Sequence, residues 1–231
     1  MMAFEASIHL RDALIVFFVA ALPSVAWFFR MRKLMLARQV IIIRRLEGLL
    51  KPRDKRYWVL GYLVGFTGKY WIYRGPIARV TVTYTTPPYH AFFYLPVIAL
   101  GRRKERLDIE VESRYKLGFN GIAHIYTPRI YSIRIGVEKE LKDRGGAALA
   151  SKELNTGGRK YKVYYNSDDA LSIAKSIMDK LAGITEVYRI SVDSDKRRII
   201  ASIAVKGVDI VEDAVRTVVG AIEELSTGER S

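Results

Sequence analysis

The sequence predicts an α+β protein in which one N-terminal transmembrane helix precedes a mixed α+β domain that ends in a β-α-β-β-α unit. Three observations predict this class. Residues 13–29 (ALIVFFVAALPSVAWFF) are uncharged and apolar, residues 57–84 alternate with a period of two, and residues 161–222 alternate between strand-like and helix-like spacing of apolar residues. Such patterns are typical of a membrane span, of strands and of amphipathic helices.

The first element is the expected anchor over residues 1–29, a short external N-terminus followed by the transmembrane helix. About 20 apolar residues cross a bilayer, and apolar neighbours on both sides can extend the run. A buried core helix is one alternative, although such a helix is rarely apolar on every side. A cleaved signal peptide is another, but its basic residues precede the apolar run, whereas here Arg30, Arg32 and Lys33 follow it. The positive-inside bias therefore predicts a single-pass protein of the cell membrane with its C-terminal domain in the cytoplasm.

The next element, residues 30–56, is predicted to be a basic juxtamembrane helix that continues from the anchor, ends at Pro52 and leads into a hinge (KPRDKR). This segment holds ten Lys or Arg residues against two acids, a net charge of +8 out of +14 for the whole chain. The density suits the phosphates of anionic lipid or of ribosomal RNA. The alternative is that these cations only set the topology.

Residues 57–66, 69–73 and 77–84 read as successive strands, and residues 85–100 (TTPPYHAFFYLPVIAL) then form an apolar stretch that three prolines keep from being a long helix. An apolar patch followed by a basic cluster indicates a membrane or partner contact. The alternative is a connection that only packs against the core of the domain. The candidates for apolar contact are Tyr89, Phe92, Phe93, Tyr94 and Leu95. The candidates for binding an anionic partner are Arg30, Arg32, Lys33, Arg38, Arg44, Arg45, Lys51, Arg53, Arg102, Arg103, Lys104 and Arg106.

The remaining pattern predicts strands over 106–112 and 119–126 and a helix over 128–144, which completes a sheet-rich subdomain over 57–144. Residues 145–160, rich in small and polar residues, are expected to be a loop. A second subdomain over 161–231 follows, with a strand over 161–165, a helix capped by Ser167 or Asp168 and ended by Gly183, a hairpin over 184–206 and a last helix from Val208.

Catalytic signatures are absent from the sequence. There is no cysteine, no phosphate-binding glycine loop and no H-E-x-x-H metal motif. His9, His90 and His124 read as packed or surface residues, and the Asp168–Asp169 pair fits the start of a helix. We therefore expect a non-enzymatic protein without cofactor or metal. A membrane enzyme acting on an anionic substrate is a remaining alternative.

The layout resembles the calumin family, the endoplasmic-reticulum coiled-coil-domain proteins of the multipass translocon. The similarity is best over residues 65–112, which include GFTGKYWIYRG, IARVTVTY and RRKERLDIEVE, and it returns over residues 167–225. This resemblance implies a factor that binds translating ribosomes and the protein-conducting channel and assists membrane-protein insertion. The compact, cysteine-free form fits a prokaryotic or archaeal relative.

Two departures qualify that resemblance. The acidic lumenal segment of the family has no counterpart before Ala13, and its long basic coiled tail has none after Leu225. The basic residues 30–56 would then have to make the ribosome contact. The second reading is a structural or assembly subunit of another membrane complex, with the stretch 85–100 as its docking surface.

Overall fold

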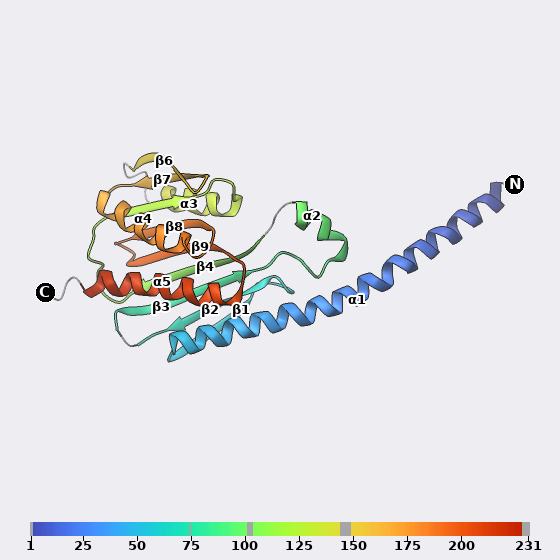
Figure 1. Ribbon diagram of the computed structural model, residues 1–231, viewed down its shortest axis with the longest axis horizontal. Helices are drawn as coiled ribbons and strands as arrows, with labels where there is room; N and C mark the ends of the chain where they lie inside the picture. Colours follow the sequence, from blue (N-terminus) through green and yellow to red (C-terminus); the bar gives the residue numbers. More distant parts are fainter. Residues whose placement is uncertain (1, 74, 101–103, 144–148, 228–231) are drawn as a thin grey trace.

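The described residues contain nine strands, which form one sheet in which every neighbouring pair is antiparallel (Figure 1). The computed structural model describes residues 2–73, 75–100, 104–143 and 149–227. The order across the sheet is β1-β2-β3-β4-β9-β8-β5-β7-β6. The strands are β1 (Asp54–Val59), β2 (Gly65–Trp71), β3 (Ile77–Thr85), β4 (Glu105–Ser113), β5 (Ile122–Tyr126), β6 (Ala150–Thr156), β7 (Arg159–Tyr165), β8 (Val187–Asp193) and β9 (Arg198–Val205).

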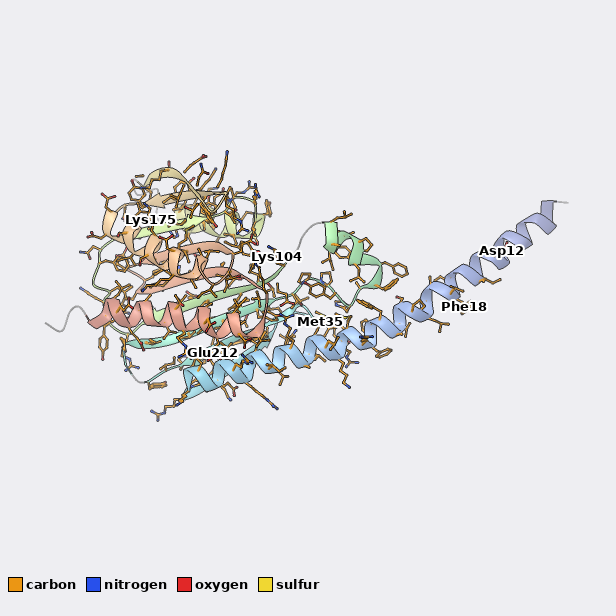
Figure 2. The ribbon with its side chains drawn as sticks, in the orientation of Figure 1. Asp12, Phe18, Met35, Lys104, Lys175 and Glu212 are labelled. Atoms are coloured by element: carbon orange, nitrogen blue, oxygen red, sulfur yellow. The ribbon has the colours of Figure 1, made fainter. Side chains whose placement is uncertain are left out.

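The helices are α1 (Met2–Leu50), the short 3-10 helix η1 (Phe92–Tyr94), α2 (Leu95–Leu100), α3 (Tyr131–Asp143), α4 (Asp168–Ala182) and α5 (Val208–Thr227). The 49 residues of α1 make a rod of about 73 Å at the usual helical rise. Its C-terminal half lies along the sheet and α5, and its N-terminal half extends away from the domain (Figure 1). Accordingly, Met35 lies where α1 meets the domain, and Phe18 lies on the extended part (Figure 2).

The predicted transmembrane helix is wrong. Within the described ranges, no helix is both long enough and apolar enough to cross a membrane. The uncharged run in α1 has 17 residues between Asp12 and Arg30 and contains Pro23 and Ser24, so it falls short of the roughly 20 apolar residues that a bilayer requires. The fold class is therefore a mixed α+β domain with a long N-terminal helix.

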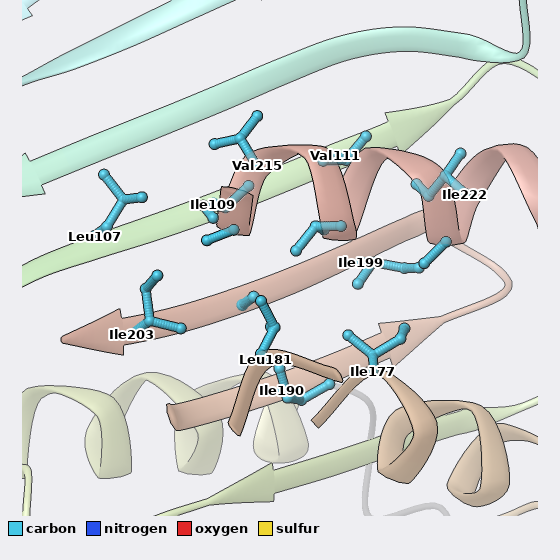
Figure 3. Close-up of a cluster of buried hydrophobic side chains, with 14 of the residues drawn as sticks. Leu107, Ile109, Val111, Ile177, Leu181, Ile190, Ile199, Ile203, Val215 and Ile222 are labelled. Atoms are coloured by element: carbon cyan, nitrogen blue, oxygen red, sulfur yellow. The ribbon is translucent and has the colours of Figure 1, made fainter. Parts of the chain in front are cut away.

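The main core lies between one face of the sheet and the helices α1, α4 and α5. Side chains at alternate strand positions project to this face, where they meet the apolar stripes of the helices. Leu107 and Ile109 of β4, Ile203 of β9, Val215 of α5 and Leu181 of α4 converge there (Figure 3). Because α5 covers β3, β4 and β9, it joins the strands of the first half of the chain to those of the second.

The opposite face of the sheet is covered only in part. Helix α3 packs there through Ile133 and Val137 against Tyr126 and Tyr188. Strands β5 and β8 are consequently buried on both faces, whereas β3 and β4 alternate between buried and partly exposed residues. The face of β1, β2, β3 and β4 that points away from the main core is thus open to solvent among the described residues.

The sequence located most of these elements within a few residues, with three differences. Strand β6 runs through residues 150–156 of the expected loop, and residues 144–148 lie outside the described residues. Strand β1 begins at Asp54, inside the expected hinge. One sheet contains strands from both expected subdomains. The basic helix continues from the apolar segment before it, as expected, since α1 runs through Pro23 to Leu50.

Candidate partner-binding surfaces

Two of the predicted anion-binding cations fasten α1 to the domain. Arg38 Nη1 donates to Oε1 of Glu105 at 2.8 Å, and Glu105 is 7% exposed. The hydroxyl of Tyr84 donates to the other carboxylate oxygen of Glu105 at 2.6 Å. Arg45 forms an ion pair with Asp209 at the start of α5. The charges of both arginines are therefore balanced inside the molecule.

The buried carboxylate lies in the wall of a groove of about 560 Å³ between α1 and β3. Burial raises the pKa of Tyr84, and the hydrogen bond to Glu105 raises it further, so the phenol remains a donor. Burial followed by the charge of Glu105 also raises the pKa of Tyr89. The groove is otherwise lined by apolar side chains such as Met31, Leu34 and Ile41.

The other predicted cations of α1 and of the segment after it are exposed. The Arg32 guanidinium carbon lies 6.0 Å from the centre of the Tyr62 ring, and that of Arg53 lies 5.1 Å from the Tyr73 ring. Arg53 also lines a groove of about 860 Å³ between the end of α1 and α5. The exposed set is Arg30, Arg32, Lys33, Arg44, Lys51 and Arg53.

The second predicted basic cluster is only partly described. Arg102 and Arg103 lie outside the described residues. Lys104 Nζ lies 2.5 Å from Oε2 of Glu186, so its charge is paired with an acid beside β8. Arg106 Nε lies 3.0 Å from Oδ2 of Asp108, and its Nη1 donates to Ser132 at the start of α3.

Two of the predicted apolar residues of the stretch 85–100, Tyr89 and Phe92, contact α1. Trp27 Nε1 donates to the Tyr89 carbonyl oxygen at 2.8 Å, and the Trp27 ring meets Phe92 edge to face. Phe28 stacks on Tyr62 and contacts His90, so the connection between β1 and β2 belongs to the same assembly.

Much of this assembly faces solvent. Phe93 is 71% exposed and Leu100 is 86% exposed. A groove of about 620 Å³ lies between α1 and η1 and is lined by Phe28, Phe29 and Phe92 among others. We call the exposed set the apolar collar. Its members are Val25, Phe29, Leu60, Tyr62, Val64, Phe93, Tyr94, Val97 and Leu100, and Leu95 is half-buried beside them.

Two of the three histidines, His90 and His124, have contacts within the domain. His90 contacts the rings of Phe28 and Tyr62, and Nδ1 of the buried His124 lies 2.9 Å from the Ser191 hydroxyl. In the described part of the chain, no three His, Asp or Glu side chains gather closely enough to hold a metal ion.

One further surface is not among those that the sequence predicts. Arg56 and Trp58 of β1 share the open sheet face with Lys69 and Trp71 of β2. The signal that could have found it is the repetition of a cation, a tyrosine and a tryptophan at 56–58 and again at 69–71.

No protein-family model matches the sequence, and no curated protein matches it either.

Proposed function

We propose that the chain is a non-enzymatic factor that docks on a membrane surface, associates there with ribosomes and the translocon, and assists membrane-protein insertion. The observation that carries the proposal is the apolar collar. Its side chains come from α1, from the β1–β2 connection and from η1 and α2, and they lie around the part of α1 that leaves the domain (Figure 1). Exposed apolar side chains in a contiguous patch are typical of membrane or partner contacts.

The charge beside the collar supports the same proposal. Arg30, Arg32 and Lys33 follow the apolar part of α1 directly and are exposed. Cations at this position meet the phosphates of anionic lipid when the collar enters the headgroup region, and each adds about 1 kcal/mol of attraction. The resemblance to the calumin family supports the ribosome and translocon as partners.

Vesicle flotation tests the membrane contact. Phe93→Ser combined with Leu100→Ser should reduce the fraction that floats with anionic vesicles, because the change removes two of the most exposed apolar side chains of the collar. Tyr131→Ser is the matched control, since Tyr131 is 67% exposed but lies on α3. An equal loss for the control, or no loss for the collar variant, would refute the membrane contact.

Co-sedimentation with ribosomes across a salt series tests the second half of the proposal. Binding should be strongest at low salt and fall steeply as salt rises, because phosphate contacts release counterions. The absence of binding at low salt would refute the association.

The groove between α1 and η1 favours a second candidate, an assembly subunit of another membrane complex. An apolar segment of a partner protein would occupy the groove beside Phe28 and Phe92. Crosslinking in native membranes distinguishes the candidates, since ribosomal and translocon proteins should dominate under the first and a different membrane complex under the second.

A further inference from the structure

Two matching tripeptides lie beside each other at the edge of the sheet. Residues 56–58 read Arg-Tyr-Trp in β1, and residues 69–71 read Lys-Tyr-Trp in β2. The strands are antiparallel, and Arg56 pairs directly with Lys69. The two tripeptides are therefore related by an approximate two-fold axis, and each tryptophan lies diagonally across from the cation of the other strand.

The alternation of a strand sends the two kinds of aromatic residue to opposite faces. Tyr57 and Tyr70 meet edge to face on the side covered by helices, with 5.8 Å between ring centres, and the Tyr57 hydroxyl donates to Glu47 of α1. These contacts hold the strands in register. The cations and tryptophans of both tripeptides consequently project from the open face.

On the open face, each cation lies over the tryptophan of the neighbouring strand. Lys69 Nζ is 5.1 Å from the centre of the Trp58 ring, and the guanidinium carbon of Arg56 is 5.4 Å from that of Trp71. Trp58 is 45% exposed, which leaves much of its indole available. The result is a flat aromatic surface that also carries two positive charges.

The charge of this surface is not balanced from within. Like charges directly opposite each other across an antiparallel pair destabilise it. Asp54 of β1, which pairs with Trp71, is the acid that shares this face with the two cations. Two acids of β4, one strand beyond β3, have partners of their own, since Glu110 pairs with Arg198 and Glu112 with Arg79. Among the described residues, neither Arg56 nor Lys69 forms an ion pair within 4 Å. An anionic ligand would relieve the repulsion that the fold leaves in place.

We propose that this open face of β1, β2 and β3 binds single-stranded RNA. Trp58 and Trp71 stack on bases, and Arg56 and Lys69 contact the phosphates. Stacking platforms combined with cations that follow the backbone are the general means by which proteins hold single strands. The assignment to RNA rests on the proposed association with ribosomes.

The rest of the face fits this occupant better than a lipid surface. Beside the cations and tryptophans, the face presents Thr67 of β2 and Thr81 and Thr83 of β3. The hydroxyls of Thr67 and Thr83 lie 3.0 Å apart. Hydroxyls beside a stacking surface can bond to the 2′-hydroxyl that distinguishes RNA from DNA. The exposed aliphatic and phenylalanine side chains that would enter a membrane lie elsewhere, in the apolar collar and along α1 at residues such as Phe17 and Phe18.

The test is fluorescence anisotropy of a labelled oligouridine with the full chain in mild detergent. Trp58→Ala and Trp71→Ala should each weaken binding by roughly fivefold or more, because stacking of one base is lost. Arg56→Gln with Lys69→Gln should weaken binding and also lower the slope of log affinity against log salt by about 1.4, as expected for two lost phosphate contacts. Trp58→Phe, which keeps a stacking ring, should restore most of the affinity.

Lys152→Gln is the matched control, because Lys152 Nζ lies 4.7 Å from the Tyr165 ring on the far strands β6 and β7. It should leave RNA affinity unchanged. Affinities of the β1–β2 variants equal to that of Lys152→Gln would overturn the proposal. Equal binding of duplex RNA or of oligodeoxyuridine would overturn the assignment to single-stranded RNA.

The outcome separates this inference from the function on which it rests. If the chain sediments with ribosomes but oligouridine does not bind, only the RNA surface is refuted. If oligouridine binds at Trp58 and Trp71 while no ribosome association is found, the RNA surface stands and the ribosome proposal fails.

Discussion

Gly65, the first residue of β2, is held against the neighbouring strand β3. Its φ is +148°, and a Cβ built there would lie 1.9 Å from the carbonyl oxygen of Tyr84. We expect Gly65→Ala to lower the free energy of unfolding by about 2 kcal/mol or more, because the backbones of two strands would have to separate. Chemical denaturation followed by circular dichroism measures this loss.

Gly75→Ala is the control for backbone strain alone. Gly75 has a φ of +70°, but nothing lies within 4 Å of its added Cβ. Its loss should be about 1 kcal/mol, the usual penalty for a left-handed conformation with a side chain. Equal losses at the two glycines would show that contact with Tyr84 contributes nothing.

Buried tyrosines give the protein a stability limit at high pH. Burial raises the pKa of Tyr126 to about 12 and that of Tyr188 to about 12. The unfolded chain ionises its tyrosines near pH 10, so folding holds these protons more tightly than the unfolded state does. The stabilisation is fully present below about pH 10 and is lost as the pH rises towards about 12.

We therefore expect the denaturation midpoint to fall between about pH 10 and about pH 12. Tyr126→Phe should reduce the steepness of that fall, because one of the groups that release a proton on unfolding is removed. Tyr115, which is 45% exposed, provides the control Tyr115→Phe. If Tyr126→Phe leaves the pH dependence unchanged, burial of this phenol does not cause the alkaline loss of stability.

At the scale of elements, the contact between Arg38 and Glu105 joins α1 to the start of β4. Arg38→Met should lower the free energy of unfolding by about 1–3 kcal/mol, because a carboxylate that is 7% exposed loses its cation. Arg44→Met, an exposed neighbour on α1, should change it by less than about 0.5 kcal/mol. Urea denaturation compares them, and equal effects would mean that the ion pair does not stabilise the fold.

The predictability of each element follows from how its faces are buried. Helices α4 and α5 and strands β3 and β4 have one buried face, which imprints a clear period on the sequence. Strand β6 (ASKELNT) lies at the edge and is mostly exposed, so it carries no such period and read as a loop. The basic segment is expected to continue the first helix until Pro52, and α1 ends just before that residue, at Leu50.

The candidate surfaces were predictable to different degrees. Residues 85–100, which form part of the collar, are recognisable from the sequence because their apolar residues follow neither a helical period nor a strand period. The pairing of Arg38 with Glu105, separated by 67 positions, could not be foreseen because proximity across the chain is set by tertiary packing. The surface of Trp58 and Trp71 required the register of β1 against β2, which the two tripeptides alone do not provide.

At the scale of the whole molecule, two surfaces of different chemistry are joined through the β1–β2 edge of one sheet. The apolar collar is built around α1 and the connection that follows β3, while the basic aromatic face belongs to β1 and β2. The β1–β2 connection, which includes Tyr62, contributes to the collar directly from the strands that carry the tryptophans. A partner held at one surface is therefore placed at a fixed distance from a partner held at the other.

This continuity predicts that the domain unfolds as one unit although the sequence suggested two subdomains. Strand β4 pairs with β9, and α5 packs across both, so the halves share a core. In a Trp27→Phe background, the fluorescence of Trp58 and Trp71 reports on the β1–β2 edge. Leu181→Ala in α4 removes a fully buried side chain of the other half and should cost about 2–5 kcal/mol.

If the sheet unfolds cooperatively, Leu181→Ala shifts the tryptophan transition and the circular dichroism transition to lower denaturant by the same amount. The reason is that the strands of both halves form one continuous sheet, and α4 packs beside α5 on it. Loss of α4 packing should therefore also expose the core beneath α5. The opposite outcome is a tryptophan transition that keeps its original midpoint while the circular dichroism transition moves. It would mean that the β1–β4 half folds independently, and the spacing of the two surfaces would then depend on that half alone.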